Sequence, residues 1–345
     1  MEYIAGLFQE IAALFLSILT LFGGVISPAT GDVLRNFSDD VNMDFVVTGD
    51  TQVCDYMPER EANLISFSED MMNSDIDLDA FIIAGDIAEN GMQDEFDRVA
   101  SHIAGFNTEN FIMCTGNHDI RLREYEQSKE RFLGFMNSLN SDANAQDDVY
   151  FKYMVGDYTF LVMGSEESRF EDAYISSAQL QWLNVELKNA TKKGNPVFVI
   201  CHYPLAEGHG LPNTWGSANS GAGDESLPIY QRKDSYDMTG CIGDQTNDVY
   251  DILVKYENVF FITGHLHTGF GKYTYETLNK KKNVQAINVP SVGIDNKDGV
   301  YNNPGTGFFV EVTDYDVTFY ARDFRNGKFL STEDWSKAVM TFELN

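Results

Sequence analysis

The segment Val259-Phe260-Phe261-Ile262-Thr263-Gly264-His265-Leu266-His267 joins a continuous apolar run to a polar end that carries two imidazoles. The apolar run predicts a buried β-strand that ends at the Gly-His step. Along an extended chain, residues i and i+2 face the same side, so we expect His265 and His267 to point into one pocket. A surface pair of histidines is the alternative. The chain has only six His, and His118 and His202 also follow apolar runs, which favours a shared site.

Four further apolar runs end in polar residues in the same way. They are Phe45-Val46-Val47 before Gly49-Asp50-Thr51-Gln52, Phe81-Ile82-Ile83-Ala84 before Gly85-Asp86, Phe111-Ile112-Met113-Cys114 before Gly116-Asn117-His118-Asp119, and Val197-Phe198-Val199-Ile200-Cys201 before His202. Helical patterns lie at residues 59–73, 92–104, 176–190 and 247–256, and further strands are expected at 158–163, 284–289, 308–312 and 316–320. Apolar strands that alternate with helices predict an α/β fold whose largely parallel or mixed sheet is covered on both faces. The Ser176-x-x-Gln179 pattern predicts a capping box at the start of its helix.

The charge of the chain argues against nucleic acid as a partner. The 24 Lys plus Arg against 53 Asp plus Glu give a formal net charge of −29, whereas nucleic-acid binding rests on clustered basic residues. The triplet Lys280-Lys281-Lys282 is expected to lie in a turn. The four Cys show no C-x-x-C spacing, so a structural zinc site is not expected, and a disulfide between Cys54 and Cys241 remains open.

Both ends of the chain are expected to lie outside the main domain. Residues 1–30 are predicted to form an apolar helix in which the polar and small positions of residues 3–26 share one narrow stripe. Such a helix could lie at a membrane surface, anchor the chain as an uncleaved span, act as an atypical signal peptide or dock on the domain. We expect a membrane-associated or exported protein, with a cytoplasmic location as the alternative. Residues 31–43 are interpreted as a linker and residues 331–345 as a C-terminal extension.

The polar residues at the strand ends are suited to binding a metal. In open α/β sheets, ligand sites form at the carboxyl ends of the strands. A mixture of carboxylate, amide oxygen and imidazole suits Mn, Fe or Zn. Each motif alone is weak, because Gly-Asp is common and a single His at a strand end is usually hydrogen-bonded. The ordered set is much more specific.

The ordered set resembles that of the calcineurin-like metallophosphoesterases, whose motifs run Asp-x-His, Gly-Asp, Gly-Asn-His-Asp/Glu, a His at a strand end, and Gly-His-x-His. The resemblance covers residues 44 to about 325 and implies a domain at 44–330 with a four-layer α/β/β/α sandwich of two mixed sheets flanked by helices. It also implies a hydrolase of phosphate mono- or diesters with two divalent metal ions. In that scheme Asp86 bridges both ions; Asn117, His202 and His265 complete one site, and Asp50 and His267 hold the other.

The same resemblance implies that His118 stands beside the metals, where it contacts the phosphate or protonates the leaving oxygen. Because Asn117 precedes it directly, an anchored Asn117 would hold the imidazole near the leaving group. Asp119 is expected either to orient His118 or to cap the following helix.

Gln52 departs from the family pattern, which usually has His at that position. An amide oxygen binds borderline metals more weakly than an imidazole does. Gln52 therefore ligates through its oxygen, holds a metal-bound water, or leaves that metal loosely bound. The alternative function is a catalytically weak or inactive, surface-associated binding protein with one degraded metal site.

A Gly-, Ser- and Asn-rich stretch at residues 205–243 is expected to form a lid over the site. His209 within it could reach a substrate, although a solvent-facing loop position is the favoured interpretation. Arg121 and Arg123 could meet an anionic substrate, with helix-surface charges as the favoured reading. The expected substrate is a phosphorylated small molecule or a lipid-linked phosphate.

Overall fold

The computed structural model describes residues 32–122, 124–206, 208–210 and 241–345, and the account below concerns the unit of residues 32–345. The apolar stretch predicted at residues 3–26 lies outside the described residues, as do Arg123 and most of the predicted lid at 205–243. Among the described helices, none is both long and apolar enough to cross a membrane.

The strands form two mixed sheets. The first sheet has the order β12-β11-β10-β1-β2-β3, with β13 paired to β11, and the second has the order β4-β5-β6-β7-β9-β8. Strands of the first sheet are β1 (Met43–Thr48), β2 (Ala80–Ile83), β3 (Phe111–Met113), β10 (Thr306–Val312), β11 (Asp316–Asp323), β12 (Lys328–Phe329) and β13 (Val339–Glu343). Strands of the second are β4 (Phe151–Val155), β5 (Tyr158–Val162), β6 (Val197–Ile200), β7 (Val259–Thr263), β8 (Tyr275–Asn279) and β9 (Val284–Asn288). Strands β1, β2 and β3 run parallel, and so do β5, β6, β7 and β9.

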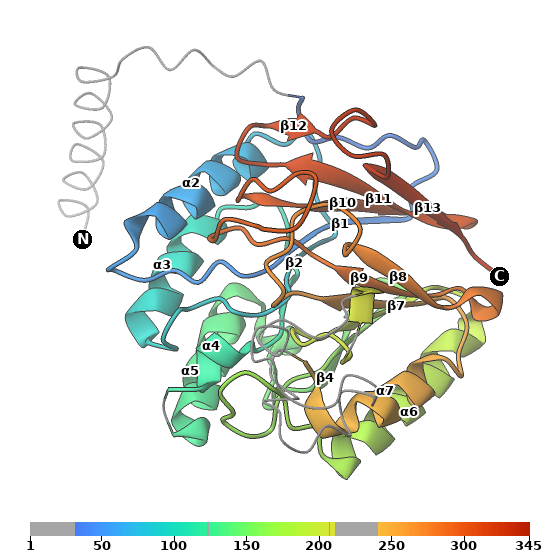
Figure 1. Cartoon of the computed structure of the whole chain (residues 1–345), viewed down its shortest axis with the longest axis horizontal. Helices are drawn as coiled ribbons and strands as arrows, with labels where there is room; N and C mark the ends of the chain where they lie inside the picture. The colour runs from blue at the N-terminus through green and yellow to red at the C-terminus, as the bar shows by residue number, and fades with distance from the viewer. Residues whose placement is uncertain (1–31, 123, 207, 211–240) are drawn as a thin grey trace. The chain divides into compact units, whose positions relative to one another are not determined.

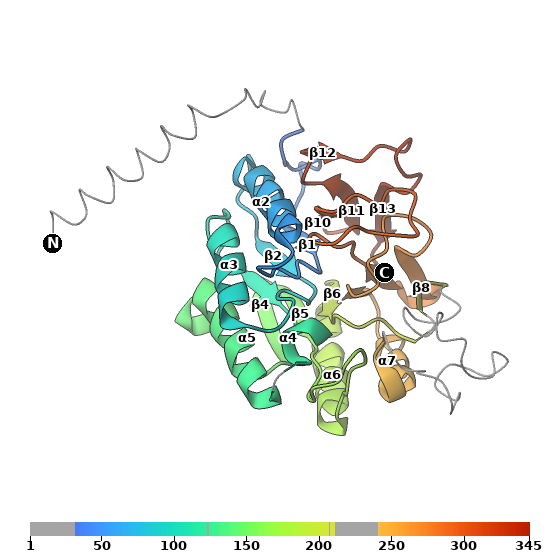
Figure 2. The same ribbon diagram turned by 60° about the vertical axis from the view of Figure 1, so that its left-hand side comes forward.

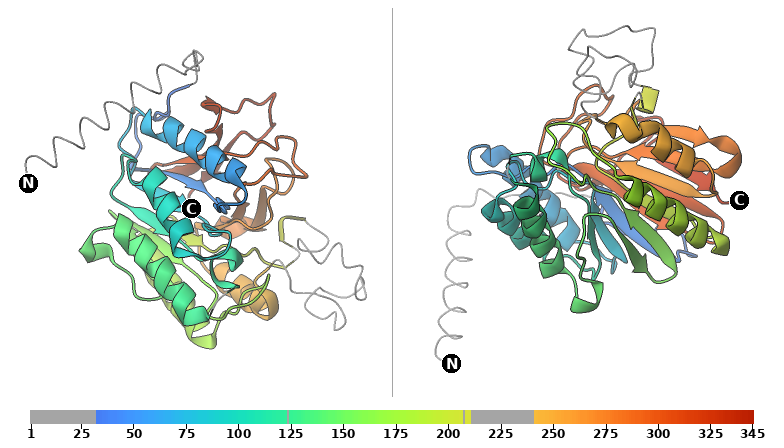
Figure 3. Two further views of the ribbon diagram at one scale, coloured as in Figure 1. Left: turned by 90° about the vertical axis from the view of Figure 1, so that its left-hand side faces the viewer. Right: turned by 90° about the horizontal axis from the view of Figure 1, so that it is seen from below.

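Two groups of helices cover the outer faces of these sheets. The helices are α2 (Pro58–Met72), α3 (Gln93–Ile103), α4 (Asn117–Ile120), α5 (Tyr125–Leu139), α6 (Ser177–Ala190) and α7 (Thr246–Leu253). Helices α2, α3 and α5 lie on one side and α6 and α7 on the other (Figure 1). In the turned view α6 and α7 lie side by side (Figure 2), and from below they lie over the strands, apart from the group of α2, α3 and α5 (Figure 3). The four-layer α/β/β/α sandwich is therefore confirmed.

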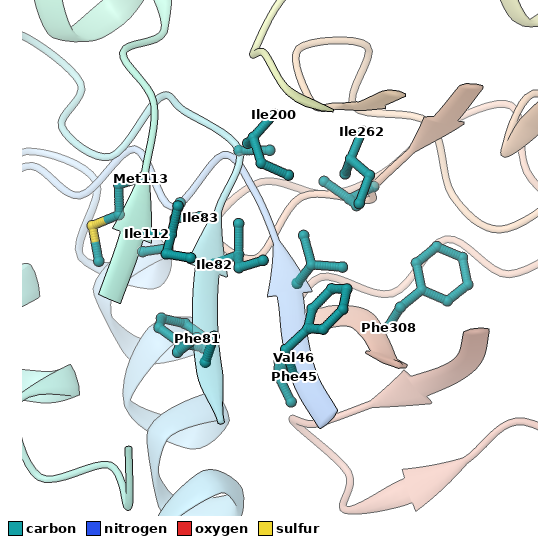
Figure 4. Close-up of a cluster of buried hydrophobic side chains, with 14 of the residues drawn as sticks. Phe45, Val46, Phe81, Ile82, Ile83, Ile112, Met113, Ile200, Ile262 and Phe308 are labelled. Carbon is teal, nitrogen blue, oxygen red and sulfur yellow. The ribbon is translucent and has the colours of Figure 1, made fainter. Parts of the chain in front are cut away.

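Alternating side chains of a strand point into the space between the two sheets and into the space between a sheet and its helices. Phe45 of β1 points toward the second sheet, where its ring centroid lies 5.0 Å from that of Phe198. Phe81 of β2 points the other way, with its ring centroid 6.0 Å from that of Phe67 on α2. Figure 4 shows side chains of β1 and β2 beside Ile200 of the second sheet. Because both faces of the central strands β1, β2, β6 and β7 are buried, these strands form continuous apolar runs in the sequence.

The expected capping box at the start of α6 forms only in part. Ser176 Oγ accepts a hydrogen bond from the Gln179 N–H at 3.2 Å, as predicted. The Gln179 amide instead donates to the Gly164 carbonyl at 2.9 Å, and the Ser176 N–H donates to Glu166 Oε2 at 2.7 Å. A carboxylate is a stronger acceptor than an amide oxygen, so Glu166 takes the position expected for Gln179.

Segments assigned to the linker and to the C-terminal extension pack against the domain. Leu34 is fully buried, and Arg322 of β11 donates from Nη2 to the Asp32 carbonyl at 2.6 Å. At the other end, β13 adds to the first sheet by pairing with β11. All four Cys are buried free thiols, so the disulfide between Cys54 and Cys241 is not formed.

Candidate metal centre

The predicted site residues follow the carboxyl ends of five parallel strands from both sheets. Asp50 and Gln52 follow β1, Asp86 follows β2, Asn117 to Asp119 begin α4 after β3, His202 follows β6, and His265 and His267 follow β7. Parallel strands place their carboxyl ends at one edge of a sheet, and here that edge is common to both sheets.

Left-handed backbone conformations are concentrated at this edge. Of the nine non-glycine residues with positive φ in the described part of the chain, five are predicted site residues. They are Asp50 (53°), Gln52 (41°), Asp86 (52°), His265 (72°) and His267 (48°). Such conformations cost on the order of 1–3 kcal/mol each and persist where the surrounding structure enforces them. The predicted strand is present as β7, but it ends at Thr263, and His265 and His267 both have positive φ. The expectation that the alternation of an extended chain directs the two histidines was therefore wrong.

Two groups of potential ligand atoms share one carboxylate. Asp86, His202 and His265 form one group and Asp50, Asp86 and His267 the other, and within each group the ligand atoms lie within 4.8 Å of one another. Gly116 leaves room for the shared carboxylate, because a Cβ added at that position would lie 2.1 Å from Asp86 Oδ1. Asp86 is 1% exposed, and although burial alone would raise its pKa, His202 and His118 hold that pKa well below its usual range.

His202 is oriented by the backbone. Its Nδ1 lies 2.8 Å from the Ala84 carbonyl oxygen, to which it donates, so Nε2 is the atom that faces the centre. That Nε2 lies 3.3 Å from Asp86 Oδ2 and 3.0 Å from His265 Nδ1. Burial lowers the pKa of His202, but Asp86, Asp50 and the hydrogen bond to Ala84 together outweigh burial and raise that pKa to about 9. Burial and the neighbouring His202 lower the pKa of His265.

Asp50 connects the two histidines that follow β7. Its carboxylate accepts from the His265 N–H at 3.2 Å, and its Oδ1 lies 3.1 Å from His267 Nε2. Asp50 is fully buried, whereas the His267 side chain is 13% exposed. The second group of ligand atoms is therefore the more accessible one.

Two amide oxygens at the centre lack a hydrogen-bond partner among the described residues, namely Gln52 Oε1 and Asn117 Oδ1. Gln52 Nε2 donates to Asp86 Oδ2 at 2.8 Å, which fixes its amide beside the shared carboxylate. Buried polar atoms are normally satisfied, so two orphaned oxygens beside two carboxylates fit a site built for cations. The residues present therefore match the divalent metals that the sequence predicts.

His118 lies beside the shared carboxylate and is held by other residues. Its Nε2 is 4.0 Å from Asp86 Oδ2, while its Nδ1 is 2.9 Å from the Glu89 carbonyl and 3.1 Å from Glu89 Oε2. Burial lowers the pKa of His118, but Asp86 and Glu89 outweigh burial and raise it. Arg121 Nη2 also lies 3.0 Å from His118 Nδ1, so Arg121 borders the site and is not simply a helix-surface charge.

Asp119 has structural contacts. In the described part of the chain its carboxylate accepts from three backbone N–H groups, those of Ile87 at 3.0 Å, Ala88 at 2.9 Å and Gly116 at 2.8 Å. Burial and the Asp86 charge raise the pKa of Asp119 to about 7. The Gly116 contact caps α4 itself, in which Asp119 is the third residue, and not a following helix. Glu89 and not Asp119 meets the His118 ring.

Three residues near the site, Glu89, Arg60 and Glu171, were not predicted from the sequence. Glu89 meets His118 and pairs with Arg60 Nη1 at 2.5 Å. Glu171 Oε2 accepts from Asn117 Nδ2 at 3.4 Å. A signal existed for Glu89, which stands three residues after Asp86, but the positions of Arg60 and Glu171 depend on tertiary packing.

His209 contributes to neither ligand group. It is 3% exposed, and its N–H donates to Glu276 Oε2 at 2.8 Å. Burial lowers its pKa to about 4. The favoured prediction of a solvent-facing histidine is therefore wrong.

Known proteins resemble this chain in fold and in sequence family. The described fold resembles a dimetal phosphatase from Danio rerio, with a TM-score of 0.59 and 14% identity over 89% of this chain and 100% of that chain. It also resembles a purple acid phosphatase from yellow lupin (Lupinus luteus) seeds, with a TM-score of 0.59 and 13% identity over 87% of this chain and 53% of that chain. A search of curated protein sequences found no match. The family model for calcineurin-like phosphoesterases matches residues 43–269, about two thirds of the sequence, and the chain thus belongs to the calcineurin-like phosphoesterase family.

Proposed function

We propose that this protein is a metal-dependent phosphoester hydrolase with two divalent ions. The observation that carries the proposal is the sharing of Asp86 between two groups of ligand atoms. Asp86, Asn117, His202 and His265 would hold one ion, and Asp86, Asp50 and His267 the other, with Gln52 beside the latter. When bound, two divalent ions would supply an activated water and neutralise the charge of the phosphate.

The residues around the centre suit the remaining steps. Glu89 holds His118 at Nδ1, which leaves Nε2 directed toward the shared carboxylate and in position to give a proton to the leaving oxygen. The net charge of −29 disfavours long polyanions, so we propose small phosphorylated molecules or lipid-linked phosphates as substrates. A contact of residues 3–26 with a lipid surface would suit the latter. The mixed nitrogen and oxygen ligands suit Mn, Fe or Zn.

The proposal is tested with purified protein loaded with Mn²⁺ or Fe²⁺ and analysed for metal content. We expect two ions per chain and hydrolysis of p-nitrophenyl phosphate or of its bis-ester. Asp86→Asn should abolish turnover, and Asp157→Asn, at a side chain 82% exposed, should leave it unchanged. Protein that holds two ions and cleaves neither ester would contradict the proposal. One ion without turnover would favour a binding protein, an alternative suggested by the weak ligand Gln52.

A further inference from the structure

The Asn117 amide is oriented by the segment between β5 and α6. Asn117 Nδ2 donates to the Phe170 carbonyl at 3.2 Å and to Glu171 Oε2 at 3.4 Å. An amide group has two N–H donors, and both are directed at these acceptors. Asn117 Oδ1 is buried and has no hydrogen-bond partner among the described residues. The two acceptors therefore hold the amide nitrogen on the side of the β5–α6 segment and leave Oδ1 turned away from that segment, buried and without a partner among the described residues.

A rotated amide would be unfavourable at this position. Rotation by 180° would direct Oδ1 at the Phe170 carbonyl and at the Glu171 carboxylate, which are both acceptors. The N–H groups would then lose their partners in a buried place, which is unfavourable. Of the two acceptors, Glu171 carries the charge and makes the contact that a substitution can remove.

Glu171 is itself held in place. Its Oε1 accepts from Arg121 Nη1 at 3.0 Å, and the Glu171 side chain is 18% exposed. The Arg121 guanidinium lies 4.7 Å from the centroid of the Phe170 ring, and Arg121 Nη2 lies 3.0 Å from His118 Nδ1. The Glu171 carboxylate thus connects Asn117 with the Arg121 guanidinium, which borders His118.

We infer that Glu171 is a positioning residue, which holds the Asn117 amide so that Oδ1 serves as a metal ligand. The inference rests on the proposed function, because it assumes the metal pair. It goes beyond that function because it states that a residue of the β5–α6 segment determines how tightly one ion binds. Residues that orient metal ligands typically change metal affinity 10–100-fold when they are removed.

Titration of the metal-free protein with Mn²⁺ by isothermal calorimetry tests this inference without relying on turnover. Glu171→Ala should weaken the binding of one ion by roughly 10–100-fold. The matched control is Glu167→Ala on the same segment, where Glu167 pairs with Arg169 at 3.3 Å and its side chain is 52% exposed. The control should bind both ions as the wild type does.

A double-mutant cycle separates positioning from general damage to the fold. If Glu171 acts through Asn117, Glu171→Ala should add almost nothing in an Asn117→Ala background. Glu171→Gln keeps an acceptor oxygen and should recover most of the affinity. Wild-type affinity in Glu171→Ala, additive losses in the double variant, or equal losses in the Ala and Gln variants would each overturn the inference. A wild-type protein that binds no Mn²⁺ would overturn the proposed metal pair and this inference with it.

Discussion

His265 and His267 stand two residues apart but serve different groups of ligand atoms. His265 lies with His202 and Asp86 and is 2% exposed. His267 lies with Asp50 and Asp86, and its side chain is 13% exposed. His267 is the one imidazole in the second group. Gln52, beside that group, directs its amide nitrogen at Asp86. The two proposed ions should therefore depend unequally on the two histidines.

We expect His267→Ala to weaken its ion more than His265→Ala weakens the other. Without His267, the second ion retains two carboxylates and a glutamine beside them, whereas the first ion without His265 still has Asp86, His202 and Asn117. Calorimetric titration with Mn²⁺ should show a larger loss of affinity for His267→Ala than for His265→Ala, and each loss should be at least the roughly tenfold that removal of a ligand-orienting residue causes. His102→Ala is the control, because His102 lies on α3 and pairs with Glu61. Equal losses in the two site variants would contradict this asymmetry.

At the scale of the elements, strand β1 carries a buried carboxylate, that of Asp44, which has no role in the proposed metal centre. Asp44 is 4% exposed, its N–H donates to Asp79 Oδ2 at 2.9 Å, and its Oδ1 accepts from the Asp79 N–H at 3.2 Å. Burial raises the pKa of Asp44 to about 6, against hydrogen bonds that lower it. The folded chain thus holds the proton of Asp44 more tightly than the unfolded chain does.

Asp44→Asn is expected to stabilise the fold near neutral pH only. Between about pH 4 and pH 6, the folded protein binds more protons at Asp44 than the unfolded chain, so the wild type loses stability as the pH rises. Above that window the ionised carboxylate costs about 2–3 kcal/mol, which the neutral amide avoids. Urea denaturation at pH 7.5 and pH 4 should show this gain at the higher pH alone. Asp157→Asn should leave the free energy of unfolding unchanged at both pH values. An Asp44→Asn variant that is destabilised at both pH values would contradict a raised pKa of Asp44.

Elements with continuous apolar runs were predictable from the sequence, and elements that depend on their neighbours were not. Residues 43–48 and 259–263 match predicted strands because both of their faces are buried. Edge strand β4 alternates buried and exposed residues, and β8 is only half-buried along its length, so neither has a comparable apolar run. Both are fixed by pairing, β4 with β5 and β8 with β9.

The same distinction holds within the candidate site. Asp50, Asp86 and His202 could be proposed because a ligand type follows a strand directly. Glu171 belongs to an irregular segment, and its approach to Asn117 depends on how β5 and α6 are connected. The number of residues that separate them, 54 along the chain, gives no hint of the contact.

At the scale of the whole molecule, the candidate centre lies where the two sheets meet. Asp50, Asp86 and Asn117 follow strands of the first sheet, and His202, His265 and His267 follow strands of the second. Asp50, Asp86 and Asp119 are also buried close together, and like charges in such a place oppose folding. Cations bound there would connect the two sheets and offset that repulsion.

Removal of the metals is therefore expected to destabilise the whole unit. An ion at 100 times its Kd adds about 2.7 kcal/mol to the free energy of unfolding, and two ions add about twice that. For a chain of this size the wild type should lose roughly 10 °C in Tm when EDTA replaces saturating Mn²⁺. Scanning calorimetry of Asp86→Asn should show almost no difference between the two conditions, because Asp86 belongs to both ligand groups. His102→Ala should keep the full difference, and a wild-type Tm that is the same with EDTA and with Mn²⁺ would show that the ions do not hold the two sheets together.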